Sequence, residues 1–225
     1  MRSFLAIFVK DFKCFFRAKS IVAAAFGFSL LMVVVASFSF RQIGFSPSEL
    51  LLITPGVIWL VFIFSGVIVL NHSFLIEKEN DALSGLLLSA GRPALVFIAK
   101  AASNLLFLSL LQIFVIVIHS ILFGVDVSQV FFQLLLISFL VICGFVCFGT
   151  LLSAMSVATA GREFMLPLLL FPLCIPLFAG AVFTTKELLL SGTISFDYFW
   201  LRLIIGFDVI SIALSYVLFE HTVQH

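Results

Sequence analysis

Long apolar stretches separated by short polar segments run through the whole chain. Each stretch is about 20 residues or longer, which is the length that an α-helix needs to cross about 30 Å of hydrocarbon. The pattern therefore predicts an all-α polytopic membrane protein with six transmembrane helices. The expected spans are residues 20–40, 50–76, 105–123, 130–157, 164–183 and 199–219.

Glycine and proline mark the connections between these spans. Gly44 and Pro47 follow the first span, Gly91 and Pro93 precede the third, and Gly161 precedes the fifth. Both residue types interrupt helices, so we expect turns at these positions. The whole chain, residues 1–225, is interpreted as a single transmembrane permease domain.

Residues 1–19 precede the first span and have the pattern of an amphipathic helix. At 100° per residue, four phenylalanines fall within one stripe and three basic residues fall nearly opposite. We expect an interfacial helix with its aromatic face toward lipid, although the basic residues alone would also serve to fix topology. The residues concerned are Phe4, Phe8, Phe12 and Phe15, and Lys10, Lys13 and Arg17.

The densest run of charge is Glu77-Lys78-Glu79-Asn80-Asp81, in a chain with 10% charged and 63% hydrophobic residues. A single charge near the bilayer centre costs about 2.5–3.5 kcal/mol on insertion scales. The run must therefore lie in water, between the second and third spans.

The distribution of basic residues predicts the orientation. Nine of the 12 lysines and arginines lie in the N-terminal segment, in the loop before the third span, or at Arg162. The positive-inside rule then places both termini and the charged loop in the cytoplasm. The other three are Arg41, Lys186 and Arg202.

The charged loop continues into an apolar run that includes Gly85, Leu86 and Leu87, and Gly91 and Pro93 then stop it. Acids at the start and a Gly/Pro stop favour a short helix over residues 77–92. Its leucines need burial, either in a groove of a soluble partner or in the membrane interface. The residues alone favour neither alternative.

Two features inside the membrane are candidates for a mechanism. The fifth span contains Pro167, Pro172 and Pro176, so we expect it to be kinked or broken, either as the wall of a translocation path or as a static bend. Asp208 lies near the middle of the sixth span, where a carboxylate is a functional candidate by default. A structural hydrogen bond, with Ser109 or Gln112 or with a neighbouring subunit, is an equally good interpretation of Asp208.

Composition and missing motifs exclude several function classes. The net charge is +1, and no basic patch interleaved with aromatics indicates nucleic-acid binding. No G-x-x-x-x-G-K-[ST] motif, C-x-x-C-H motif or cluster of nucleophile, acid and base occurs in the sequence. We therefore expect no enzyme and no bound metal, and we expect any ATP hydrolysis to occur in a partner subunit.

Several short motifs together resemble a known family. They include Lys10-Asp11, Pro55-Gly56-Val57-Ile58-Trp59-Leu60, Asn71-His72-Ser73-Phe74 leading into Glu77-Lys78-Glu79, Gly85-Leu86-Leu87-Leu88, Gly161-Arg162-Glu163 with Leu166-Pro167, and Phe207-Asp208-Val209-Ile210. Over nearly the full length the chain resembles the haem exporter protein B (CcmB) family, the permease of the cytochrome c maturation ATP-binding-cassette system. Asn80-Asp81 stands where that family usually has Asp-Gly, and Ser84 replaces an acid.

The resemblance implies an ABC-2 exporter type of fold, with a coupling helix in residues 77–92 that docks on a separate ATPase subunit. It implies two copies in a complex with a haem-handling membrane subunit and a haem chaperone, in a bacterial inner membrane or its mitochondrial equivalent. Haem is then the transported or handled ligand. The ATPase cycle would drive either haem transfer or release of the haem-loaded chaperone, and a permease for polysaccharide, lipid or drug is the alternative.

Overall fold

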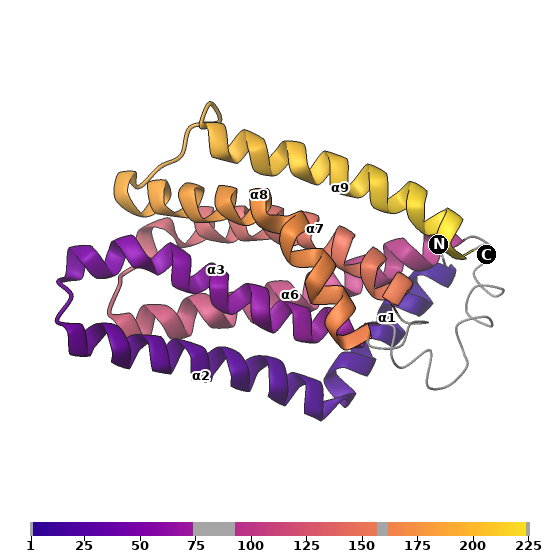
Figure 1. Cartoon of the computed structure of the whole chain (residues 1–225), viewed down its shortest axis with the longest axis horizontal. Coiled ribbons are helices and arrows are strands. Elements are labelled where there is room, and N and C mark those ends of the chain that lie inside the picture. The colour runs from indigo at the N-terminus through magenta and orange to yellow at the C-terminus, as the bar shows by residue number, and fades with distance from the viewer. Residues whose placement is uncertain (1, 74–92, 157–161, 224–225) are drawn as a thin grey trace.

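The computed structural model describes residues 2–73, 93–156 and 162–223, and these ranges are almost entirely helical (Figure 1). The helices are α1 (Arg2–Arg17), α2 (Lys19–Ile43), α3 (Pro47–His72), α6 (Pro93–Phe123), α7 (Phe131–Ser156), α8 (Arg162–Ser191) and α9 (Phe199–Val223), and the 3-10 turn η1 (Ser128–Val130) precedes α7.

Six of these helices, α2, α3, α6, α7, α8 and α9, are long and apolar enough to cross a membrane, which confirms the predicted all-α polytopic fold. The largest difference from the sequence prediction is the third span. It begins near Ala94 rather than at Leu105 and is 30 residues long. At about 1.5 Å per residue this helix is about 45 Å long and exceeds the roughly 30 Å hydrocarbon layer.

Local sequence explains where the helices end. Gly44 closes α2 with a positive φ of 81°, a conformation that glycine adopts without strain. Ser46 and Glu49 then form a capping box at the start of α3, and Pro47 occupies the first turn. The predicted interruption at Gly44 and Pro47 is therefore confirmed.

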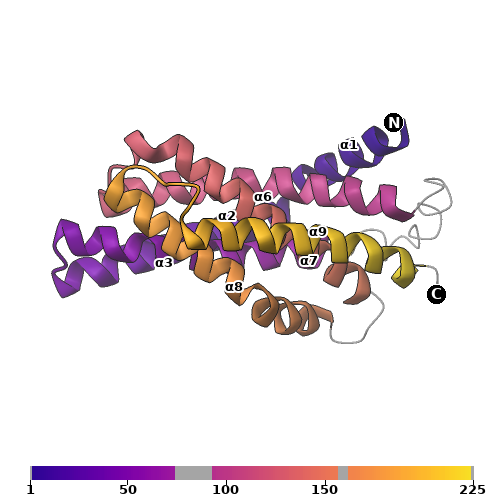
Figure 2. The same cartoon turned by 90° about the horizontal axis from the view of Figure 1, so that it is seen from above.

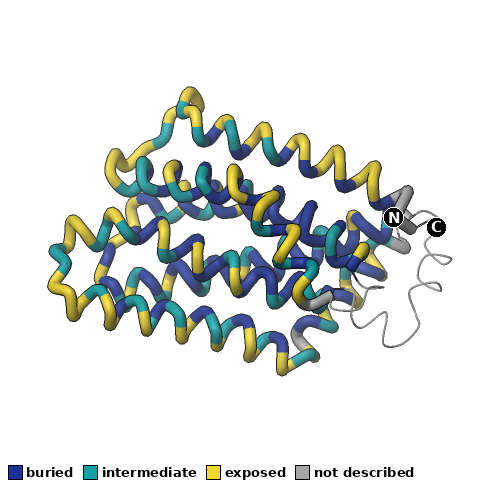
Figure 3. The backbone as a smooth tube through the Cα atoms, viewed as in Figure 1, coloured by how far each residue is buried: buried dark blue, intermediate teal, exposed yellow. Residues whose placement is uncertain are grey.

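Aromatic side chains fill the centre of the bundle, where α3, α7 and α8 meet. The ring centroids of Trp59 and Phe62 lie 5.8 Å apart, and Phe145 lies 5.5 Å from both Phe62 and Phe178. The indole nitrogen of Trp59 donates a hydrogen bond to Thr185 Oγ1 at 3.0 Å. The buried residues lie on the faces of the helices that point into the bundle, as Figure 3 shows.

Small residues let neighbouring helices approach closely. Added to Gly149, a Cβ atom would collide with the side chain of Leu70 on α3. At Gly180 on α8, it would lie 2.9 Å from Ile204 Cγ1 and 3.3 Å from the carbonyl oxygen of Trp200, both on α9. Close backbone approach at small residues is a usual way for membrane helices to associate.

The three prolines bend α8 but do not break it. Pro167, Pro172 and Pro176 all lie within the continuous helix Arg162–Ser191. Each removes one backbone hydrogen bond and crowds the preceding turn, which is a common cause of helix bending. The first half of α8 turns away from α9 (Figure 2), and Phe164 and Leu168 in that half are 79% and 73% exposed.

Both termini lie at one end of the bundle, and the connections α2–α3, α6–α7 and α8–α9 lie at the other (Figures 1 and 2). An even number of spans produces this arrangement. The end that carries the termini also carries α1 and the start of α6.

Candidate functional site

Helix α1 packs lengthwise against the first half of α6. A stripe at helical spacing, Ile7, Asp11 and Phe15, is buried at this contact. Ile7 packs with apolar residues of α6, and the ring of Phe15 stacks on Phe107 with centroids 4.8 Å apart. Phe15 therefore faces the protein, whereas the sequence pattern placed it on the lipid-facing stripe. Helix α1 itself is confirmed, and its position in the membrane interface stays a prediction.

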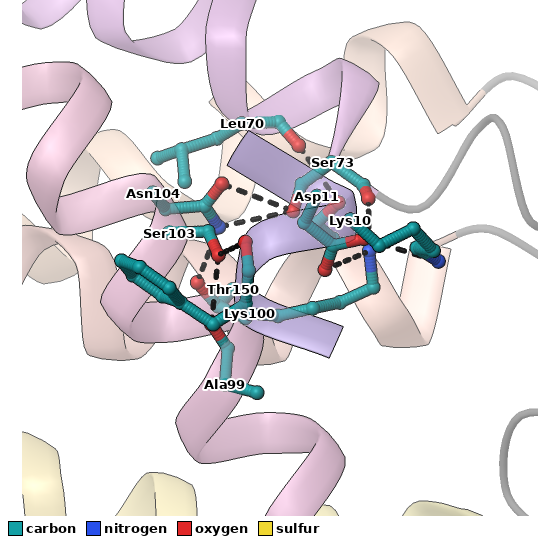
Figure 4. A network of polar contacts seen from close by, with 11 residues as sticks. Lys10, Asp11, Leu70, Ser73, Ala99, Lys100, Ser103, Asn104 and Thr150 are labelled. Carbon is teal, nitrogen blue, oxygen red and sulfur yellow. Dashed lines mark hydrogen bonds and ion pairs between the residues drawn. The ribbon is translucent and has the colours of Figure 1, made fainter. Parts of the chain in front are cut away.

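A buried ion pair lies in the middle of this contact (Figure 4). Lys100 Nζ on α6 lies 3.3 Å from Asp11 Oδ2 on α1, and the two side chains are 2% and 6% exposed. Lys10 Nζ lies 3.1 Å from the other carboxylate oxygen of Asp11. Lys100 Nζ also donates a hydrogen bond to the carbonyl oxygen of Ser73 at 2.7 Å. The ammonium group thus joins α1, α6 and the end of α3.

Asn104, one turn after Lys100, extends the contact to α7. Its Nδ2 donates to Thr150 Oγ1 at 2.9 Å and to Ser73 Oγ at 3.0 Å. Nearby, Ser153 Oγ donates to the carbonyl oxygen of Leu70 at 2.8 Å. Four helices therefore meet in one buried polar network. We call Asp11, Ser73, Lys100, Asn104 and Thr150 the polar junction.

The polar junction is energetically demanding. Burying two opposite charges removes their hydration, and the loss is offset only where geometry and further hydrogen bonds are good. The carbonyl of Ser73 supplies such a bond here. A small recess of about 20 Å³ lies beside the pair, lined by Asp11, Cys14, Phe15, His72, Ser73, Lys100 and Asn104. Asp11, Ser73, Lys100 and Asn104 from the polar junction form part of the lining of this recess.

The location of the polar junction relates it to the predicted coupling segment. Ser73 is the last described residue before that segment, and α6 begins directly after it at Pro93. Ser73 is thus part of the four-helix contact, and Lys100 joins the same contact about two helical turns after α6 begins. The segment itself lies outside the described residues, and with it the predicted coupling residues Glu77, Lys78, Glu79, Asn80, Asp81, Gly85, Leu86 and Leu87.

The sequence interpretation missed the polar junction because it assigned Lys100 to a water-facing loop. A search for long apolar runs starts the third span after Lys100 and Asn104, since both are polar. The signal that was present is their spacing of four, which puts both side chains on one helix face. Asp11 entered the sequence analysis only through the Lys10-Asp11 motif of the resemblance.

Asp208 forms a second polar position, deep in the bundle. It lies on α9 and is 6% exposed, and its Oδ1 atom has no hydrogen-bond partner among the described residues. The backbone of Gly144 on α7 lies directly against Oδ1, because glycine has no Cβ to block the approach. Neither proposed partner bonds to it: Ser109 donates to the carbonyl of Leu105 at 2.7 Å, and the Gln112 amide has no partner in the described part of the chain.

The other predicted residues are at the start of α8. Arg162 and Glu163 are the first two residues of that helix, and Gly161 lies outside the described residues. The prolines at 167, 172 and 176 are on the same helix as these two residues, but on a different part of the bundle from the polar junction.

The four cysteines, Cys14, Cys143, Cys147 and Cys174, are free thiols. Among the described residues, no three His, Cys, Asp or Glu side chains are grouped as metal ligands would be. His119 on α6 is fully buried and stacks on Phe123 with ring centroids 4.0 Å apart.

The chain was compared with protein families and with curated proteins. The family model described as CcmB protein matches residues 2–225, nearly the whole chain. A search of curated proteins gives no match.

Proposed function

Because this chain belongs to the CcmB protein family, it is a permease component of the haem export system, and we propose that it couples ATP hydrolysis in a separate subunit to haem delivery during c-type cytochrome biogenesis. The chain spans the membrane several times, and the proposal concerns what its helices transmit.

The observation that carries the proposal is that the polar junction joins Ser73, directly before segment 74–92, to the helix α6 that follows this segment. Lys100 and Asn104 on α6 hold Ser73 at the end of α3, and Lys100 also holds Asp11 on α1. A force applied to this segment from outside would reach α1, α3, α6 and α7 together. Packed elements with buried charge contacts transmit displacement because they do not deform continuously.

We place the ATPase contact in residues 77–92. Glu77 and Glu79 at the start of this predicted helix would favour it through the helix dipole and would offer charge to a partner. The leucines that follow would fill a groove on that partner. The chain has no phosphate-binding motif of its own, so the nucleotide would be bound by the partner.

The displacement that the ATPase would transmit to these helices has two candidate uses. It moves haem, or another ligand, through the membrane, or it releases a haem-loaded chaperone from a neighbouring haem-handling subunit. The proposed assembly has two copies of this chain and an ABC-2 exporter type of arrangement, in a bacterial inner membrane or its mitochondrial equivalent. Both termini and segment 74–92 are then cytoplasmic, because most basic residues lie at that end.

The test replaces Glu77 and Glu79 with alanine in the complete complex. We expect the variant chain to insert normally but to retain less of the ATPase subunit when purified by a tag on this chain. The matched control replaces Glu187 and Asp197, two acids at the opposite end of the bundle, and should retain the ATPase. An unchanged ATPase stoichiometry and hydrolysis rate in the Glu77/Glu79 variant would contradict the docking assignment.

A further inference from the structure

Helix α1 has a second face that the polar junction does not use. Lys10, Lys13 and Arg17 recur at helical spacing on the side of α1 away from the buried stripe, and all three are exposed. The Lys10 side chain is 42% exposed although it also contacts Asp11. The three side chains form a continuous strip of positive charge.

An exposed apolar strip lies next to these cations. Leu5 and Val9 on α1 are 54% and 41% exposed, and they do not pack on α6. Phe4, Phe8 and Phe12 stack along the helix with ring centroids 6.2 and 6.3 Å apart. Helix α1 therefore presents cationic and apolar surfaces side by side, in addition to its docking stripe.

The connection to α2 keeps this surface close to the start of a candidate membrane span. Ala18 alone separates α1 from α2, and its amide donates to the carbonyl of Cys14 at 2.9 Å. Helix α2 is a candidate membrane span from its first residue, Lys19. The cationic strip therefore lies within a few helical turns of the start of this candidate span, and α1 lies at the end of the bundle that carries the termini in Figure 2.

We propose that Lys10, Lys13 and Arg17, together with Leu5 and Val9, form a binding site for anionic phospholipid. Ammonium and guanidinium groups donate to phosphate oxygens, and the net negative charge of the lipid selects it over a zwitterionic one. Leu5 and Val9 enter the acyl region beside the headgroups. An acidic protein surface would match the cations but would leave these two apolar side chains in water, so lipid is the better fit.

The site has a consequence for the proposed function, although its lipid binding does not depend on that function. Lys10 Nζ lies 3.1 Å from Asp11, and Asp11 pairs with Lys100 in the polar junction. A headgroup bound at Lys10 is thus one contact away from the buried pair. The lipid composition around α1 would adjust how firmly α1 is held on α6.

Native mass spectrometry of the full-length protein in detergent tests the proposal, with phosphatidylglycerol and phosphatidylcholine as probes. The wild type should retain phosphatidylglycerol preferentially, and a variant with Lys10→Gln, Lys13→Gln and Arg17→Gln should retain it at least about fivefold less. The charge-matched control carries Arg41→Gln, Lys186→Gln and Arg202→Gln at the other end and should bind as the wild type does. Higher salt should weaken the retention of phosphatidylglycerol by the wild type, and this measurement needs no variant.

Three results would overturn the proposal. The first is equal retention of the two lipids by the wild type. The second is the same loss of phosphatidylglycerol in the control variant, which would reflect total charge rather than a site. The third is unchanged lipid retention in the α1 variant with loss of the ATPase subunit, which would assign the cationic strip to a protein partner.

Discussion

Lys100 keeps 2% of its side chain exposed, so its ammonium group depends on Asp11 and the Ser73 carbonyl to replace lost hydration. Removing one member of a buried pair leaves the other charge uncompensated, at a cost of about 3–5 kcal/mol. Lys10 also contacts Asp11 and moderates this cost. The pair can therefore be tested by removing one charge and then both.

At this scale, Lys100→Met should lower the stability of the purified protein, and Asp11→Leu combined with Lys100→Met should recover part of the loss. The reason is that the double variant leaves no buried carboxylate without its partner. Thermal aggregation midpoints of the single and double variants in detergent check this. A double variant that loses as much as the sum of the two single variants would show that the two charges do not interact.

The second prediction at this scale concerns Asp208, whose Oδ1 atom lies against Gly144. Asp208→Asn keeps the shape of the side chain and should leave assembly of the complex intact, whereas the branched side chain of Asp208→Leu should crowd Gly144 and destabilise the complex by about 1–3 kcal/mol. Assembly is measured by co-purification, and function by the yield of haem-bound c-type cytochromes. An assembled Asn variant without such cytochromes would give the carboxylate charge a role in a transport path instead.

Among the elements, α8 and α9 are held together where Gly180 lets α9 approach closely. Gly180→Val should destabilise the bundle by about 1–3 kcal/mol, because Ile204 and the backbone of Trp200 leave no space for a branched side chain. Gly27→Val on α2 is the matched control, since a Cβ atom there meets nothing within 4 Å. Thermal midpoints of the two variants give the comparison, and equal midpoints would contradict this account of the α8–α9 contact.

The elements were predicted from the sequence far better than their contacts. Hydrocarbon imposes a length and a composition on every span, so six apolar runs sufficed to identify six helices. The start of α6 was wrong by about three turns, because Lys100 and Asn104 resemble loop residues until their partners are known. No periodicity relates position 11 to position 100, so the polar junction could not be derived from local pattern.

The whole molecule has its termini at one end and three connections at the other (Figure 1). A reporter fused after His225 should therefore be cytoplasmic, and reporters inserted at Phe45 or Ser191 should be external, because the basic residues concentrate at the terminal end. Paired phosphatase and fluorescent-protein fusions check each position. An external C-terminus would overturn the proposed orientation and move the polar junction away from any cytoplasmic ATPase.

The contact between α1 and α6 also has a consequence for biosynthesis. Ser103 donates to the carbonyl of Phe8, a residue 95 positions earlier in the chain. At about 5–20 residues per second, a ribosome needs about 5–19 s to make that interval. During this time α2 and α3 are already being inserted while Asp11 has no Lys100 to pair with. Helix α1 can thus reach its place on α6 only after α2 and α3 have been made, and until then Lys10 is the partner available to Asp11.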